Sequence, residues 1–144
     1  MAADLISLYQ EAEKMDVDVF WFSLNADQSM AIQLEDGSCA VAIDPRKTDS
    51  IASVTASLAH ELGHCATGSF YSPWAACDVR EKHENRADKW AIQTLITADD
   101  LDGAVASGCT TLWALAEHFD VTPDLMRKAV CWYTHGNLAA DLYF

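Results

Sequence analysis

Basic residues are scarce in this sequence. Its 144 residues include nine lysines and arginines against 22 aspartates and glutamates, which gives a formal net charge of −13 with neutral histidines. Nucleic-acid binding depends on basic side chains that displace counterions from phosphates, and anionic membrane surfaces attract the same side chains. The acidic balance therefore argues against both nucleic acid and a membrane surface as partners.

Long apolar runs are also missing. The longest apolar stretches, residues 17–24 and 51–62, are too short or too interrupted to span a bilayer. The first residues show no basic segment followed by an apolar one, which a secretory signal would require. We therefore expect a protein that is neither exported nor membrane-spanning, with a cytoplasmic location.

Paired cysteine motifs are absent as well. No C-x-x-C pair occurs among the five widely spaced cysteines, which are Cys39, Cys65, Cys77, Cys109 and Cys131. Cysteines of a cytoplasmic chain are expected to be reduced, and most of them to be buried. Their spacing gives little support to a zinc site made of thiolates.

No repeat, low-complexity tract or linker rich in glycine, serine or proline divides the chain. The composition, with 51% hydrophobic and 22% charged residues, suits a chain that folds around a packed core. A length of 144 residues is typical of one domain. We therefore predict that residues 1–144 form a single domain.

The first third of the chain predicts a helix followed by a small sheet. Residues 3–14 place apolar side chains at helical spacing. Three later segments are short and rich in β-branched and aromatic residues, namely residues 17–23, 30–34 and 39–44. Asp36-Gly37 between the last two is a hairpin turn signal. We predict a small antiparallel sheet near the N-terminus.

The remainder of the chain predicts helices. From Thr48 onward apolar residues recur at three- and four-residue steps as far as Gly68, a helix stop signal. Asp78 and Glu81 resemble a capping box that opens a second helix, which runs to about Ile96. Shorter helices are expected at about residues 98–106, at 111–119, and from Thr122-Pro123 onward. Strands that precede helices indicate an α+β fold.

The segment His60-Glu61-Leu62-Gly63-His64 is an H-E-x-x-H motif within the first of the long predicted helices. At 3.6 residues per turn, His60 and His64 lie on one face and can offer two imidazoles to one metal ion. Glu61 is offset by about 100°. Its carboxylate can therefore lie beside the ion without binding it and take a proton from water. The motif predicts a catalytic zinc site with Glu61 as the general base.

A catalytic zinc site needs a third protein ligand and one open position. Glu84 in the next predicted helix is the favoured ligand. Asp88 lies one turn later on the same face, where it can accept the second ring N–H of a ligating histidine. His83 and Glu81 are the rival ligands, although His83 faces about 100° away and Glu81 belongs to the proposed capping box. The predicted ligands are His60, His64 and Glu84.

A second motif follows, Glu84-Asn-Arg-Ala87-Asp88-Lys-Trp90-Ala91 and then Leu95-Ile96. With H-E-x-x-H before it, the chain resembles the ImmA/IrrE family of zinc metallopeptidases, also called DUF955. Members of that family pair H-E-x-x-H with a downstream E-x-x-A-[ND]-x-[FW]-A-x-x-L-[LI] segment. The resemblance covers about residues 48–96 well. It departs from the family at Thr97, where proline often stands, and at Trp90, which is more often Phe.

The resemblance implies a small zincin-like fold, with Glu61 as general base and zinc bound by His60, His64 and Glu84. It also implies a bacterial, phage or mobile-element protein, since the family is common there and some members cleave a helix-turn-helix repressor. We therefore predict a hydrolase, a zinc metallopeptidase that cleaves a protein, with a repressor of the same genetic element as the candidate substrate. The alternative is a regulatory protein that binds zinc and its partner without catalysis.

The predicted domain thus has three parts: a helix and small sheet in about residues 1–47, the metal-site helices in 48–97, and C-terminal helices in 98–144. Tyr71, His118 and His135 are candidates to stabilise an oxyanion, and Tyr71, between the two metal-site helices, is the best placed. Packing is the alternative role of Tyr71. Asp88 has the alternative role of an ion-pair partner for Lys89 or Arg86.

Residues 112–126 resemble a helix-turn-helix in their apolar spacing. A DNA-binding version needs a basic second helix, and this one offers only Arg127 and Lys128. We therefore interpret the segment as a structural helical hairpin and a docking surface for the substrate. An acidic DNA-binding regulator is the weakest of the three alternatives.

Overall fold

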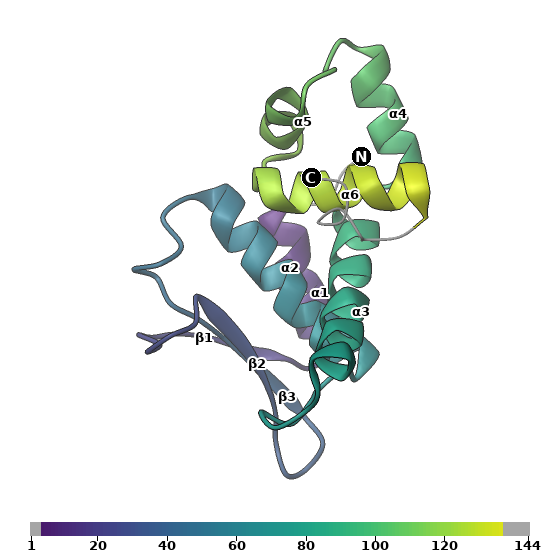
Figure 1. Cartoon of the computed structure of the whole chain (residues 1–144). Coiled ribbons are helices and arrows are strands. Elements are labelled where there is room, and N and C mark those ends of the chain that lie inside the picture. Colours follow the sequence, from purple (N-terminus) through teal and green to yellow (C-terminus); the bar gives the residue numbers. More distant parts are fainter. Residues whose placement is uncertain (1–3, 137–144) are drawn as a thin grey trace.

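The computed structural model describes residues 4–136, in which three strands and six helices form an α+β fold that is mostly helical (Figure 1). The elements are α1 Leu5–Lys14, β1 Asp18–Trp21, β2 Ser29–Gln33, β3 Cys39–Ile43, α2 Ile51–Thr67, α3 Cys77–Leu95, α4 Ala98–Ala106, α5 Leu112–Phe119 and α6 Pro123–His135. Their types and order agree with the predicted segments. The predicted helical region runs to residue 144, and residues 137–144 lie outside the described part.

The sheet is mixed, so the prediction of an antiparallel sheet is wrong. Its strand order is β1-β3-β2, with β3 antiparallel to β2 and parallel to β1. The Asp36-Gly37 turn accounts for the antiparallel pair, because Gly37 adopts a φ of 87° that the hairpin requires. Just beyond the parallel pair, the fully buried Asp44 joins the two chain segments, because its carboxylate accepts a hydrogen bond from the Leu24 backbone N–H at 2.9 Å. This contact joins residues 20 positions apart, and no local turn signal reveals it.

The part of the core that supports the site lies between the sheet and α2, and the same apolar cluster continues into α1 and into α3 to α6. Val41 and Ile43 of β3 are fully buried and belong to one apolar cluster with Leu58 and Leu62 of α2, which are equally buried. Each buried aliphatic side chain of this kind contributes about 1.5–3 kcal/mol relative to an exposed one. The helix that carries the H-E-x-x-H motif is therefore held rigidly against the sheet.

A disulfide adds a covalent link at the same interface. Cys39 at the start of β3 and Cys65 near the end of α2 are bonded, with their Cα atoms 6.0 Å apart. The expectation of five reduced cysteines is therefore wrong for this pair, while Cys77, Cys109 and Cys131 are free. The two partners are 26 residues apart, and only the packing of sheet on helix brings them together.

Helices α2 and α3 approach each other most closely at Gly63. A Cβ atom added there would lie 2.9 Å from the Ala87 Cα and still closer to the Ala87 carbonyl oxygen. Such a contact is shorter than real Cβ atoms show, so only glycine fits at this position. The glycine of the first motif and the alanine of the second therefore let α2 and α3 lie side by side (Figure 1).

The start of α3 differs from the prediction. The helix begins at Cys77, and its N-cap residue Ala76 offers no side-chain hydrogen bond. Asp78 already lies within the first helical turn, so the proposed capping box of Asp78 and Glu81 is wrong. Because Asp78 is helical, its carboxylate contributes instead by lying near the positive end of the helix dipole.

Other predicted helix ends are confirmed. Gly68 ends α2 in the left-handed conformation, with a φ of 64°. Thr122 caps α6, where its hydroxyl accepts a hydrogen bond from the Leu125 N–H, and Pro123 is the first helical residue. The sharp turn between α5 and α6 passes through Asp120, which has a φ of 53°. The buried side chains of this helical hairpin include Ala116, Phe119, Val121 and Met126, in agreement with its apolar spacing.

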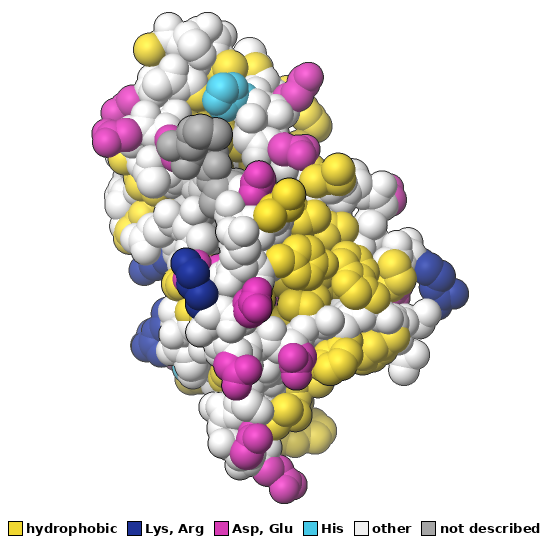
Figure 2. Space-filling model, turned by 180° about the vertical axis from the view of Figure 1, so that it is seen from behind, with side chains coloured by type: hydrophobic (Ala, Val, Ile, Leu, Met, Phe, Trp, Pro, Cys, Tyr) yellow, Lys and Arg dark blue, Asp and Glu magenta, His cyan; other side chains and the backbone are white. Residues whose placement is uncertain are grey.

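Exposed apolar side chains gather on one face of the molecule. Figure 2 shows a continuous hydrophobic area on the side turned away from the viewer in Figure 1. Most of the exposed large apolar residues lie in the N-terminal half, among them Ile6 and Tyr9 of α1 and Phe20 and Trp21 of β1. None of the helices in residues 4–136 combines the length and the apolar character needed to cross a lipid bilayer.

Candidate metal centre

Three side chains from the two packed helices converge on one point. The Nε2 atoms of His60 and His64 on α2 lie 3.2 Å apart. The Glu84 Oε2 atom of α3 lies 3.0 Å from the first and 2.8 Å from the second. The i, i+4 spacing stacks the two histidines on one helix face, and the close approach at Gly63 brings Glu84 opposite them.

Each histidine is held by its other ring nitrogen. The His60 Nδ1 lies 2.7 Å from Asp88 Oδ1, and the His64 Nδ1 lies 2.6 Å from the carbonyl oxygen of Ser69. A carboxylate and a backbone carbonyl only accept hydrogen bonds, so each neutral ring carries its proton on Nδ1. When both rings are neutral, both Nε2 atoms therefore direct lone pairs at each other and at Glu84, whereas a proton on either Nε2 is donated to Glu84.

This donor set fits a divalent metal ion. Two imidazole lone pairs and a carboxylate oxygen about 3 Å apart repel one another unless a cation or a proton lies among them. Two histidines and a glutamate with an open fourth position are a ligand set typical of catalytic zinc. The same set can also bind Mn²⁺, Fe²⁺ or Co²⁺. The residues that would hold the ion are His60, His64 and Glu84.

The charges around the cluster favour a positive charge within it. Burial lowers the pKa of His60, but its hydrogen bonds to Asp88 and Glu84 have the larger combined effect. The net result is a pKa of about 10. Burial raises the pKa of the Glu84 carboxyl, yet hydrogen bonds from both histidines and from Tyr71 bring it far below its ordinary value. A metal ion must therefore displace a proton that the metal-free protein holds on His60.

Metal binding is consequently expected to tighten as the pH rises. His60 is protonated in the metal-free protein below a pH of about 10, so the binding of an ion releases a proton across the neutral range. One released proton makes the apparent Kd for zinc fall by up to about tenfold for each pH unit. Competition with a chromophoric chelator between pH 6 and pH 8.5 measures this slope. A Kd that does not change with pH would contradict the assignment of His60.

Glu61 lies beside the cluster and outside it. Its side chain is buried, and Ser29 of β2 donates its hydroxyl to Glu61 Oε2 at 2.7 Å. Burial raises the pKa of Glu61, while the neighbouring His60 and the Ser29 hydroxyl oppose that rise only in part. A carboxylate with a raised pKa is a better proton acceptor at neutral pH. Sequence reasoning missed Ser29, which lies 32 residues before its partner.

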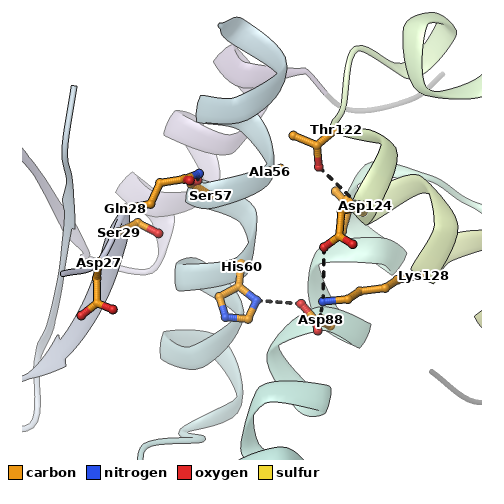
Figure 3. Close-up of a pocket in the computed structure, with 11 residues that line it drawn as sticks. Asp27, Gln28, Ser29, Ala56, Ser57, His60, Asp88, Thr122, Asp124 and Lys128 are labelled. Carbon is orange, nitrogen blue, oxygen red and sulfur yellow. Dashed lines mark hydrogen bonds and ion pairs between the residues drawn. The ribbon is translucent and has the colours of Figure 1, made fainter. Parts of the chain in front are cut away.

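A cavity of about 360 Å³ opens beside this carboxylate. Its lining combines the site with β2 and the loop after α2, and includes Glu61, His64, Glu84, Tyr71 and Met30. A second cavity of about 250 Å³ lies on the other side of His60, between α2, α3 and α6 (Figure 3). His60 therefore borders one cavity, whereas His64 and Glu84 border the other.

Among the three oxyanion candidates, Tyr71 is placed at the cluster. Its hydroxyl donates to Glu84 Oε1 at 2.8 Å, and burial together with this hydrogen bond raises the Tyr71 pKa to about 12. His118 on α5 and His135 in the last turn of α6 are exposed, and neither is among the described residues that line the two cavities. Tyr71 therefore holds the second oxygen of Glu84, which directs the first toward the histidines.

The rival third ligands lie elsewhere. The ring of His83 stacks on Tyr71, with ring centroids 6.0 Å apart, and its buried Nδ1 has no hydrogen-bond partner within the described part of the chain. Glu81 is exposed on α3. The structure therefore brings Glu84, and neither of these two residues, to the histidine pair.

Asp88 joins the cluster to the C-terminal helices. Its Oδ1 faces His60, and its Oδ2 lies 3.1 Å from the Lys128 Nζ of α6. Lys89, one of the alternative ion-pair partners, lies over the ring of Trp132 at 4.9 Å. Sequence reasoning missed the contact with Lys128, because the two residues are 40 positions apart and no motif links them.

Comparisons of the chain with protein-family models, with curated proteins and with solved structures find no match. The function must therefore be argued from the site itself. That site consists of three convergent side chains at the helix pair and the buried carboxylate of Glu61 at the edge of a cavity.

Proposed function

We propose that the protein is a zinc-dependent metallopeptidase that resembles the ImmA/IrrE family. The observation that carries the proposal is the convergence of two Nε2 atoms and a carboxylate oxygen beside the buried Glu61. A structural zinc site usually takes four protein ligands, whereas this cluster offers three and borders a cavity. Three ligands with room for water and substrate favour catalysis over a structural role.

When bound, zinc would polarise the scissile carbonyl and make a water molecule acidic enough to attack at neutral pH. Glu61 takes a proton from the attacking water and passes it to the leaving amine. Ser29 holds one oxygen of Glu61, which leaves the other free to face the water. Tyr71 holds Glu84, and its proposed contribution to an oxyanion requires that it turn from this carboxylate.

The proposed substrate is an exposed segment of a protein. Both cavities are lined by Asp27 and by Ser29, the first residue of β2, so we propose that an extended segment binds beside this strand. A chain with a net charge of −13 attracts basic partners and repels nucleic acid. A helix-turn-helix repressor of the same genetic element, cleaved in the cytoplasm, is the substrate we propose.

Replacement of the general base tests the proposal. Glu61→Gln is expected to retain about one zinc per chain, because Glu61 is not among the convergent ligands, and to lower kcat by about 10²–10⁴-fold. Zinc content is measured by elemental analysis, and cleavage by mass spectrometry of a peptide library and of co-produced repressor. Glu81→Gln, an exposed change of the same charge on α3, is the matched control and should cleave like the wild type.

The outcome also separates the two function classes. If Glu61→Gln binds zinc and keeps its full biological effect, the enzyme proposal is wrong. The alternative would then hold, a regulatory zinc protein that binds its partner without cleaving it. A wild-type protein that takes up no zinc after addition of the metal would contradict both.

A further inference from the structure

Lys128 connects the C-terminal helix α6 to the proposed metal site. Its Nζ lies 3.1 Å from Asp88 Oδ2 and 3.9 Å from Asp124 Oδ2, one helical turn earlier on α6. The side chain of Asp88 is only 8% exposed, whereas Lys128 is 33% exposed at the wall of the second cavity. Figure 3 shows Asp88 between His60 on one side and Lys128 on the other.

We propose that Lys128 is a positioning residue for the metal ligand His60 and acts through Asp88, an inference that rests on the proposed function. The two oxygens of Asp88 have different partners, the His60 ring at 2.7 Å and Lys128 at 3.1 Å. A carboxylate held at both oxygens cannot rotate freely. Its Oδ1 therefore fixes the His60 ring with Nε2 directed at Glu84, the orientation that a metal ion requires.

The charge of the site supports this role. Three carboxylates surround the cluster, Glu61, Glu84 and Asp88. A divalent ion would balance two of the three negative charges, and Lys128 supplies the third positive charge. A buried carboxylate beside a neutral, metal-bound imidazole is costly unless another cation compensates it. Lys128 is the cation that contacts Asp88 from outside the ligand set.

The same contact gives the C-terminal helices a role in the site. Helix α6 packs on α3, and its second turn delivers Lys128 to the outer oxygen of Asp88. The orientation of His60 therefore depends on the position of α6. Lys128 of this helix lies 40 residues after Asp88, the residue that it contacts. Helix α6 is in this sense part of the proposed metal site.

The zinc affinity of Lys128→Met tests the inference in the full-length chain. Loss of the group that contacts a ligating histidine, here Asp88, weakens metal binding by about 10–100-fold. Lys128 lies one contact further out, so we expect its loss to raise the Kd for zinc by up to about tenfold. Arg127→Met is the matched control, because the neighbouring Arg127 pairs with Asp124 and does not contact Asp88. Lys128→Arg should restore most of the affinity, because a guanidinium can reach the same oxygen. Competition with a chromophoric chelator gives the Kd, and the visible spectrum of bound Co²⁺ reports ligand geometry.

A double variant shows whether Lys128 acts through Asp88. In an Asp88→Asn background, Lys128→Met should change the Kd by less than about twofold, because coupled residues are not additive. Two outcomes would overturn the positioning role: a Kd for Lys128→Met equal to that of Arg127→Met, or the same rise in Kd when Lys128→Met is made in the Asp88→Asn background. In either case, zinc binding by the wild type would leave the proposed function standing. Failure of the wild type to bind zinc would overturn both. If Lys128→Met does not fold, Lys128→Gln and Lys128→Arg supply the same comparison.

Discussion

Glu84→Ala is expected to remove zinc binding and, with it, all hydrolysis. The glutamate supplies the one oxygen among the three convergent atoms, and it comes from α3, whereas both histidines come from α2. Loss of an outer partner already costs about 10–100-fold in metal affinity. Loss of a direct ligand should therefore raise the Kd by more than about 100-fold.

Two measurements check this expectation. Elemental analysis of purified protein should find near one zinc per chain in the wild type and little in the variant. Zinc at 100 times its Kd stabilises a folded protein by about 2.7 kcal/mol, which raises Tm by roughly 5–10 °C for a domain of this size. The wild type should show this shift and Glu84→Ala should not.

Glu81→Ala is the matched control for this experiment. It removes an exposed glutamate one turn earlier on the same helix, so its zinc content and its Tm shift should equal those of the wild type. Full retention of zinc by Glu84→Ala would mean that another residue is the third ligand. His83, adjacent on α3, would then be the next residue to replace.

Gly63→Ala is expected to damage the fold and the metal site together. The added methyl group would collide with the Ala87 backbone, which cannot move aside as a flexible side chain could. Overpacking of a core costs about 1–3 kcal/mol, and a backbone contact belongs at the upper end or beyond it. Because the collision pushes α3 away from α2, Glu84 should also withdraw from the two histidines, and zinc affinity should fall.

Gly103→Ala is an informative comparison because it should raise the stability of the protein, whereas Gly63→Ala should lower it. Gly103 lies inside α4, and an added Cβ would meet nothing within 4 Å. Alanine favours a helix interior by about 0.8–1 kcal/mol over glycine, so this variant should be slightly more stable than the wild type and bind zinc equally well. Chemical denaturation and chelator competition measure both effects. A Gly63→Ala protein as stable as Gly103→Ala would show that the helix contact is not tight.

The short-range features of this protein were predictable from sequence because they depend on neighbours along the chain. Helical periodicity places His60 and His64 on one face of α2, and Gly68 and Thr122 mark helix ends by their local conformations. The i, i+4 relation of Glu84 and Asp88 likewise determines that both face the same side of α3. The capping box at Asp78 failed, although it is local, because α3 begins before it.

Tertiary structure decided most of the features that join distant residues. The exceptions are Glu84 and Asp88, whose place beside the two histidines the second motif predicted. The parallel pairing of β1 with β3, the Cys39–Cys65 disulfide and the contacts of Ser29 and Lys128 each connect residues 20 or more positions apart. Hydrophobic periodicity predicts only which face of a helix or strand is buried, and many different elements of the chain can cover that face. The sequence by itself thus determined the motif and the helices that present it. Only packing, through the buried sheet and the contact at Gly63, decided which atoms meet around the proposed metal ion.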